Sequence, residues 1–245
     1  MFNLIDTINP EICIRELKNK HEGKIAVLVG TGPSVLEENT KKFFEKANEE
    51  KYIYFTNNQG FLFDTIKNLF KTDYYLISDP KAFNRTVKGI FRFEPSRMKI
   101  VASKLLSRKI KIEPKKSKKV LLRRQKYKNN FHHLGNDTNL ILKEFINIPE
   151  YYYTRSSIYI SLQLILFFGI KKIYLVGCDC CSRNSHSIPK LDNVKIHGRG
   201  PKNFHENLVK CWEVIYQYLK EYYPSIDIQV VSPKGLKSII PGYTP

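Results

Sequence analysis

A chain of 245 residues with 42% hydrophobic and 13% aromatic residues is long and apolar enough to bury a core, which excludes a wholly disordered protein. The formal net charge of +18 indicates an anionic partner, such as a phosphorylated ligand, nucleic acid or the anionic face of a membrane. No apolar run reaches the length of a membrane-spanning helix, and the N-terminus lacks the basic and apolar regions of a signal peptide, so we expect a cytoplasmic protein.

Strand and helix patterns alternate in the first hundred residues. The apolar run from Lys24 to Gly30 predicts a buried parallel strand. Ser34, with Glu37 three residues later, predicts a capping box at the start of the helix that follows. Three more strands are predicted at 52–58, 73–79 and 99–103, with a helix at 60–71.

The periodic patterns are lost between residue 104 and about residue 149. Within this range, 104–128 holds twelve Lys or Arg residues and one acid. We interpret 104–149 as a basic, lid-like insertion, partly helical or mobile, over the open edge of a site. Such a segment would also suit peripheral contact with anionic lipid. The segment does not favour nucleic acid as the partner, because few aromatic residues are interleaved with the basic ones and no docking motif is present.

Regular patterns return in the last third of the chain. Two helices are predicted at 156–169 and 203–223, each followed by a strand, at 171–179 and 226–232. Strands separated by helices predict an α/β fold, with a Rossmann-like parallel sheet and helices on both faces. We expect residues 1–245 to form a single nucleotide-binding domain that carries the insertion.

The residues after the predicted strands are candidates for a ligand site, because ligands of parallel α/β sheets lie beyond the carboxyl ends of the strands. Glycines in the GTGPS turn after the first strand let a backbone approach an anion, and a helix start directs N–H groups and its dipole at it. We therefore predict that this turn binds the phosphate end of a nucleotide. An ordinary strand-to-helix turn would give the same short pattern.

The order of the motifs is more specific than any one of them. VLVGTGPSV, then FTNNQ, a strand ending in SDP, and RSSIYISLQLILFFGIKKIYLVGCD together resemble the pattern of two related families. One is the bacterial sialyltransferases of glycosyltransferase family 42. The other is the MptE-like family, named for 6-hydroxymethylpterin pyrophosphokinase. The resemblance covers both halves of the sheet and leaves out 104–149.

The resemblance to the sialyltransferases implies a set of residues that bind the CMP part and the carboxylate of the donor. In this sequence the set is Gly30, Thr31, Gly32, Pro33, Ser34, Asn58, Ser156, Ser157, Gly177 and Asp179. Thr31 stands where the family has Asn, and Cys181 stands where it has a Tyr that steadies the leaving phosphate. A family Asn near the transfer site falls on Asp79, and the Asp-Pro pair there is closer to the MptE-like pattern.

The same resemblance implies a catalytic histidine, which falls best on His205, with His197 as the other candidate. Transfer of a sugar to a hydroxyl needs a base, and the dipole of a helix that begins near Asn203 would keep His205 neutral. A surface histidine in a polar loop is the alternative interpretation. Arg199 and Lys202 would stabilise the charge of the departing phosphate.

The sequence therefore favours a metal-independent glycosyltransferase that moves an acidic sugar from a CMP-activated donor to a surface-glycan acceptor. No D-x-D motif follows a strand, and the C-x-C-C run at 178–181 lacks the spacing of a structural zinc site, so no cofactor is predicted. One alternative is an MptE-like pyrophosphokinase in which Asp79 and Asp179 hold Mg²⁺ with ATP. Another is a nucleic-acid binding module built on 104–128.

Overall fold

The structure is a computed structural model that describes residues 18–57, 60, 63–64, 68–77, 99–102, 131–133, 157–180 and 204–244. In chain order its elements are β1 (Ile25–Val29), the 3₁₀ turn η1 (Pro33–Leu36), α2 (Glu38–Glu49), β2 (Ile53–Asn57), β3 (Tyr74–Ile77), β4 (Lys99–Ala102), β5 (Phe131–His133), α8 (Ser157–Phe167), β6 (Lys172–Val176), α9 (Phe204–Tyr222) and β7 (Asp227–Val230).

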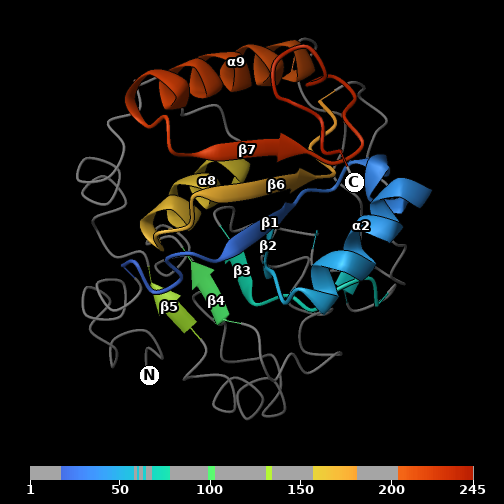
Figure 1. Cartoon of the computed structure of the whole chain (residues 1–245), viewed down its shortest axis with the longest axis vertical. Helices are drawn as coiled ribbons and strands as arrows, with labels where there is room; N and C mark the ends of the chain where they lie inside the picture. The colour runs from blue at the N-terminus through green and yellow to red at the C-terminus, as the bar shows by residue number, and fades with distance from the viewer. Residues whose placement is uncertain are drawn as a thin grey trace, which may run out of the picture.

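The described strands form one seven-stranded sheet in the order β5-β4-β3-β2-β1-β6-β7, and every neighbouring pair is parallel. From β1 the chain adds β2 to β5 on one side, then returns to add β6 and β7 on the other side (Figure 1). The order of the strands therefore reverses between β1 and β6, and this is where ligands of open parallel sheets bind. The α/β, Rossmann-like fold predicted from the sequence is confirmed.

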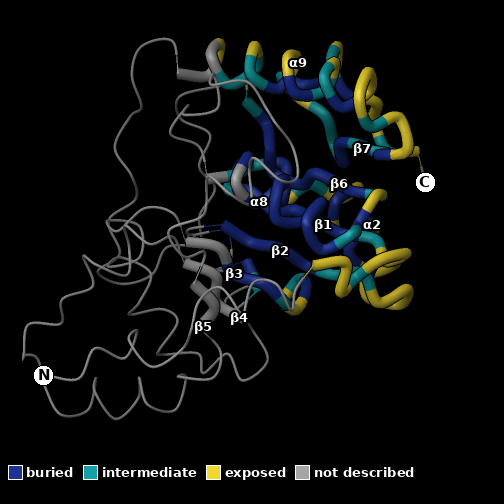
Figure 2. The backbone as a smooth tube through the Cα atoms, turned by 90° about the vertical axis from the view of Figure 1, so that its left-hand side faces the viewer, coloured by how far each residue is buried: buried dark blue, intermediate teal, exposed yellow. Residues whose placement is uncertain are grey.

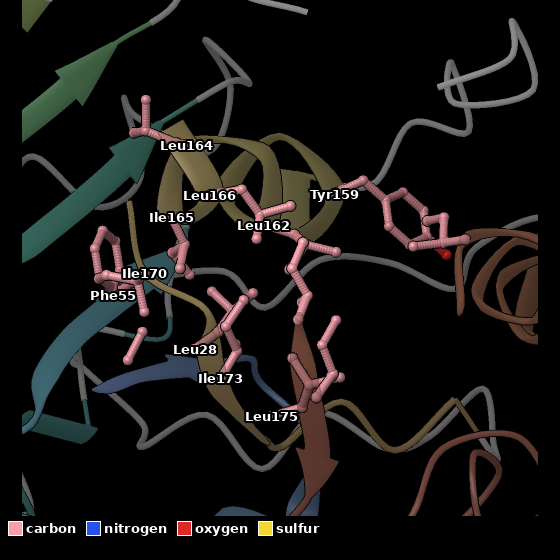
Figure 3. Packing of buried hydrophobic residues seen from close by; sticks show 14 of the residues in the cluster. Leu28, Phe55, Tyr159, Leu162, Leu164, Ile165, Leu166, Ile170, Ile173 and Leu175 are labelled. Carbon is pink, nitrogen blue, oxygen red and sulfur yellow. The ribbon is translucent and has the colours of Figure 1, made fainter. Parts of the chain in front are cut away.

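Helices cover both faces of the sheet. On one face, α8 buries residues such as Leu162 against Leu28, Phe55 and Ile173 of the strands (Figure 3). Trp212 of α9 belongs to the same buried cluster. On the other face, α2 packs its aromatic side chains against the alternate residues of β1, β2 and β6. Figure 2 shows that the central strands are buried along their length while the outer surfaces of α2 and α9 are exposed. Burial of each large apolar side chain stabilises the fold by about 1.5–3 kcal/mol.

Two local predictions near the N-terminus are wrong. The capping box is not formed: residues 33–36 form η1, and α2 begins at Glu38 with Glu37 as its N-cap residue. The hydroxyl of Ser34 is instead bonded to a residue on another loop, as described below. The helix predicted at 60–71 also ends earlier, since Asn68–Lys71 are not helical and Asn68 has a φ of 51°.

The range that we predicted to be an insertion, 104–149, contributes β5 to the sheet. β5 pairs in parallel with β4, with Phe131 opposite Ile100. The pattern of the sequence does not reveal this strand, because three residues are too few for an alternation of polar and apolar residues to be recognised. The other residues of 104–149, and with them the predicted lid, lie outside the described residues.

Candidate functional site

The loops that follow β1 and β6 meet at the point where the strand order reverses. β1 and β6 are paired as far as Val29 and Val176, so Gly30 and Gly177 leave the sheet side by side. The N–H of Gly30 donates to the carbonyl oxygen of Val176 at 2.7 Å, and the N–H of Gly32 donates to the carbonyl oxygen of Gly177 at 2.8 Å. These bonds extend the contact between the two strands into the GTGPS turn.

Glycine is required in this turn for the contact between the loops. A Cβ atom at Gly32 would lie 2.5 Å from Cγ of Asp179, and one at Gly30 would lie 2.5 Å from the carbonyl oxygen of Gly177. Gly177 itself has a φ of +67°, in the left-handed region that favours glycine. The sequence suggested that the glycines make room for an anion. In the structure they make room for the loop after β6, and the N–H groups of Gly30 and Gly32 are engaged within the protein.

Ser34 ties the turn to Asp179. Its backbone N–H donates to Oδ2 of Asp179 at 2.9 Å, and its hydroxyl donates to Oδ1 of the same carboxylate. Both side chains are buried. Burial raises the pKa of Asp179 above its ordinary value, and the two bonds from Ser34 offset only part of this effect. Asp179, on the loop after β6, therefore fixes the position of the GTGPS turn, which follows β1.

The segment after β7 is the third part of the chain that lies at this site, beside the loops after β1 and β6. Gly235 donates its N–H to the carbonyl oxygen of Asp179 at 2.8 Å, and Nζ of Lys234 lies 2.6 Å from Oε1 of Glu37. The hydroxyls of Ser232 and Thr40 are hydrogen-bonded at 3.0 Å, which adds a second tie to α2. Sequence reasoning did not include this segment in the site. The sequence feature that could have identified it is the SPKG turn, which follows the last strand directly and therefore lies at the same edge of the sheet as the other loops.

A buried amide lies at the carboxyl end of β2. Asn57 is 4% exposed, and its Oδ1 accepts a hydrogen bond from the hydroxyl of Ser161 on α8. Within the described part of the chain, nothing accepts a hydrogen bond from Nδ2 of Asn57. The sequence directed attention to the next residue, Asn58, which lies outside the described residues. Asn57 is thus a further polar group at the ligand-binding edge of the sheet.

The helices α8 and α9 both begin at this edge, because each precedes a parallel strand and runs back along it. Ser157 is the first residue of α8, and His205 is the second residue of α9. The backbone of both residues is described but their side chains are not.

The structure thus brings together seven of the predicted site residues: Gly30, Thr31, Gly32, Pro33, Ser34, Gly177 and Asp179. Six others lie outside the described residues: Asn58, Asp79, Ser156, His197, Arg199 and Lys202. Among the residues that are described, no helix combines the length and the apolar character needed to cross a membrane.

Comparisons with known proteins agree with this architecture. The profile of the family described as 6-hydroxymethylpterin diphosphokinase MptE-like matches residues 2–185. Two similar solved structures are sialyltransferases of Campylobacter jejuni, each 20% identical to this chain. CstII, in complex with cytidine-5'-monophosphate, has a TM-score of 0.57, with 91% of this chain and 86% of CstII covered. The monofunctional α-2,3-sialyltransferase Cst-I has a TM-score of 0.58, with 92% of this chain and 82% of Cst-I covered. No curated protein matches the chain significantly in sequence.

Proposed function

We propose that this chain, which belongs to the MptE-like family, is a glycosyltransferase that moves an acidic sugar from a CMP-activated donor to a glycan acceptor. The likeness in fold to the sialyltransferases extends over 91% of the chain, and so reaches beyond residue 185, where the match to the family profile ends. Other structures of CstII contain the substrate analogue CMP-3FNeuAc, or a trisaccharide acceptor together with CMP. These ligands support a nucleotide-sugar donor and a glycan acceptor for this chain.

The observation that carries the proposal is the pair formed by Ser34 and Asp179. A magnesium-dependent transfer of a phosphoryl group uses carboxylates that face the phosphates and the metal. Asp179 follows β6 at the reversal of strand order, where such a carboxylate would be expected, but it is 5% exposed and Ser34 donates to both of its oxygens. Its geometry suits a residue that fixes the GTGPS turn, and this favours a site that works without a metal.

The reaction would proceed by direct displacement. The acceptor hydroxyl attacks the anomeric carbon of the donor sugar, and the bond from that carbon to the phosphate oxygen breaks. CMP leaves with the electron pair of the broken bond, and a base takes the proton of the hydroxyl. General-base catalysis of this kind contributes about 10²–10⁴-fold to the rate.

The proposed base is His205, with His197 as the alternative. His205 lies in the first turn of α9, where the positive end of the helix dipole disfavours the imidazolium form. A neutral imidazole is what a base requires. We further propose that Arg199 and Lys202 stabilise the charge on the departing phosphate, and that the GTGPS turn holds the nucleotide. Asp79 would lie near the transferred sugar.

A second candidate function follows from the description of the family, which names a 6-hydroxymethylpterin diphosphokinase. Such an enzyme would transfer a pyrophosphoryl group from ATP, with Mg²⁺ held by Asp79 and Asp179. For Asp179 to bind the metal, its carboxylate, which is 5% exposed and accepts both hydrogen bonds of Ser34, would first have to become accessible. The two candidates therefore differ in nucleotide and in the need for magnesium.

A thermal-shift experiment with CMP, ADP and ATP, each with and without Mg²⁺, separates the two candidates. At a concentration of 100 times its dissociation constant, a ligand stabilises the folded state by about 2.7 kcal/mol, which gives a measurable rise in Tm. The glycosyltransferase proposal expects CMP to raise Tm without Mg²⁺. A rise with ATP and Mg²⁺ alone would support the pyrophosphokinase and overturn the first proposal.

A further inference from the structure

The segment from Ser232 to Gly235 places a lysine beside the candidate nucleotide site. Lys234 is the exposed residue of the turn that follows β7, and its ammonium group forms an ion pair with Glu37 across 2.6 Å. Glu37 is the N-cap residue of α2, three residues beyond Ser34. The ion pair therefore joins the turn that follows β7 to the start of α2, just beyond the GTGPS turn.

The backbone next to Lys234 is held rigidly. The N–H of Gly235 donates to the carbonyl oxygen of Asp179, and a Cβ atom at Gly235 would lie 2.7 Å from the carbonyl oxygen of Cys180. Glycine is therefore needed for this close approach. The backbone that carries Lys234 is thus held, through Gly235, by Asp179. This is the same residue that accepts both hydrogen bonds from Ser34.

The charges around the turn make this lysine important for an anion. Asp179 and Glu37 are both acidic and lie close enough to influence each other electrostatically. Two carboxylates beside a turn that receives a phosphate would repel it. The charge of Lys234 acts on Asp179 in the opposite sense to that of Glu37, and so opposes this repulsion. Its side chain is 40% exposed, so solvent and ligands can reach it.

We propose that Lys234 is a specificity-determining residue that recognises the phosphate of the bound nucleotide, and that Glu37 competes with the phosphate for it. This inference rests on the proposed nucleotide site at the GTGPS turn. In the free protein Lys234 is paired with Glu37, and on binding its ammonium group donates to the phosphate oxygens. A lysine on a flexible stem with three donors is suited to such an exchange of partners.

A purely structural role for Lys234 makes the opposite prediction for Glu37. If the ion pair only tied the segment after β7 to α2, removal of either partner would loosen the site, and both changes would weaken nucleotide binding. If Lys234 binds the phosphate, Lys234→Gln weakens binding, whereas Glu37→Gln releases the lysine and removes a repelling charge. The two variants then change affinity in opposite directions.

The experiment measures the dissociation constants of CMP, cytidine, ADP and adenosine by titration calorimetry, for the full chain and three variants. For the phosphorylated nucleotide that binds, Lys234→Gln is expected to weaken affinity roughly tenfold, the equivalent of one charged hydrogen bond. Glu37→Gln is expected to strengthen it about two- to threefold. The matched control is Lys237→Gln, which removes an exposed lysine three residues further along the chain and should change nothing. The affinity of the nucleoside without phosphate should be equal in all four proteins.

The outcomes separate this inference from the proposed function. If CMP binds and Lys234→Gln binds it as tightly as the wild type, or if Glu37→Gln weakens it as much as Lys234→Gln does, the inference on Lys234 is wrong while the function stands. If ADP binds and CMP does not, the proposed function is wrong, and the same variants test Lys234 with ADP. If neither nucleotide binds, both proposals fail.

Discussion

Ser34 donates two hydrogen bonds to the carboxylate of Asp179, a residue 145 positions later in the chain. The first comes from the backbone N–H at 2.9 Å and the second from the hydroxyl. The pair joins the loop after β1 to the loop after β6, and so it closes the point at which the order of the strands reverses. The position of the GTGPS turn therefore depends on a side chain from the other half of the fold.

Replacement of this carboxylate should destabilise the protein. In Asp179→Asn the amide nitrogen cannot accept a hydrogen bond, so one of the two donors of Ser34 loses its acceptor inside the protein. We expect the free energy of unfolding to fall by about 1–3 kcal/mol, measured by urea denaturation. The control is Glu213→Gln, an exposed residue of α9 that should cost almost nothing. Equal stability of Asp179→Asn and the control would show that the pair does not hold the turn.

The effect of Asp179→Asn on stability should also depend on pH. Burial raises the pKa of Asp179 in the folded state, so the folded protein binds its proton more tightly than the unfolded chain does. The stability that this proton gives the folded state is fully present below pH 3.8, the pKa of Asp179 in the unfolded chain. It is lost as the pH rises through the pKa of the folded state. The difference in unfolding free energy between wild type and variant should therefore be larger at pH 4 than at pH 7. A difference that grows between pH 4 and pH 7 would mean that the pKa is lowered.

Gly32 should tolerate no side chain. A Cβ atom there would meet the carboxylate of Asp179 and the carbonyl oxygen of Gly177, at 2.6 and 2.7 Å. In Gly32→Ala the turn must move away from the loop after β6, at a cost of about 1–3 kcal/mol. We expect lower thermal stability together with weaker binding of CMP. Gly242→Ala is the control, because the nearest atom to its Cβ lies at an ordinary 3.4 Å. A fully stable Gly32→Ala variant that binds CMP normally would remove this turn from the site.

The parallel sheet could be predicted from the sequence, and the contacts between its loops could not. Buried parallel strands such as β1 and β6 are short apolar runs that end at glycine, so their residues carry the signal themselves. The interpretation of Ser34 as a capping residue used only its neighbours in the chain. Its real partner lies 145 residues away, where a local rule does not look. Lys234 was missed for the same reason, because its partner Glu37, the N-cap residue of α2, lies 197 positions earlier in the chain.

The basic run at 104–128 is predicted to bind anionic membranes. Each Lys or Arg near such a surface contributes about 1 kcal/mol, and salt screens this attraction. Neutralisation of Lys115, Lys116, Lys118 and Lys119 should therefore weaken binding to vesicles that contain phosphatidylserine, and should leave Tm almost unchanged. The measurement is vesicle co-sedimentation at two salt concentrations. Binding that does not respond to salt, or a large loss of stability, would contradict the prediction.

The identity of the catalytic base gives the last prediction. If His205 takes the proton of the acceptor, His205→Ala should lower kcat by roughly 10²–10⁴-fold with little change in affinity for the donor, because the lost interaction forms mainly in the transition state. The position of His205 supports this role, since it lies in the first turn of α9 and this helix begins at the edge of the sheet where the GTGPS turn lies.

His197→Ala is the matched variant for this test, and it should have the milder effect. Both variants are assayed with the same CMP-activated donor, and CMP binding is measured alongside to confirm that the site is intact. A separation of kcat from donor affinity is what distinguishes a base from a residue that only supports the fold. Near-normal turnover in His205→Ala would end the proposal for this residue, and a collapse of kcat in His197→Ala alone would transfer the role to His197.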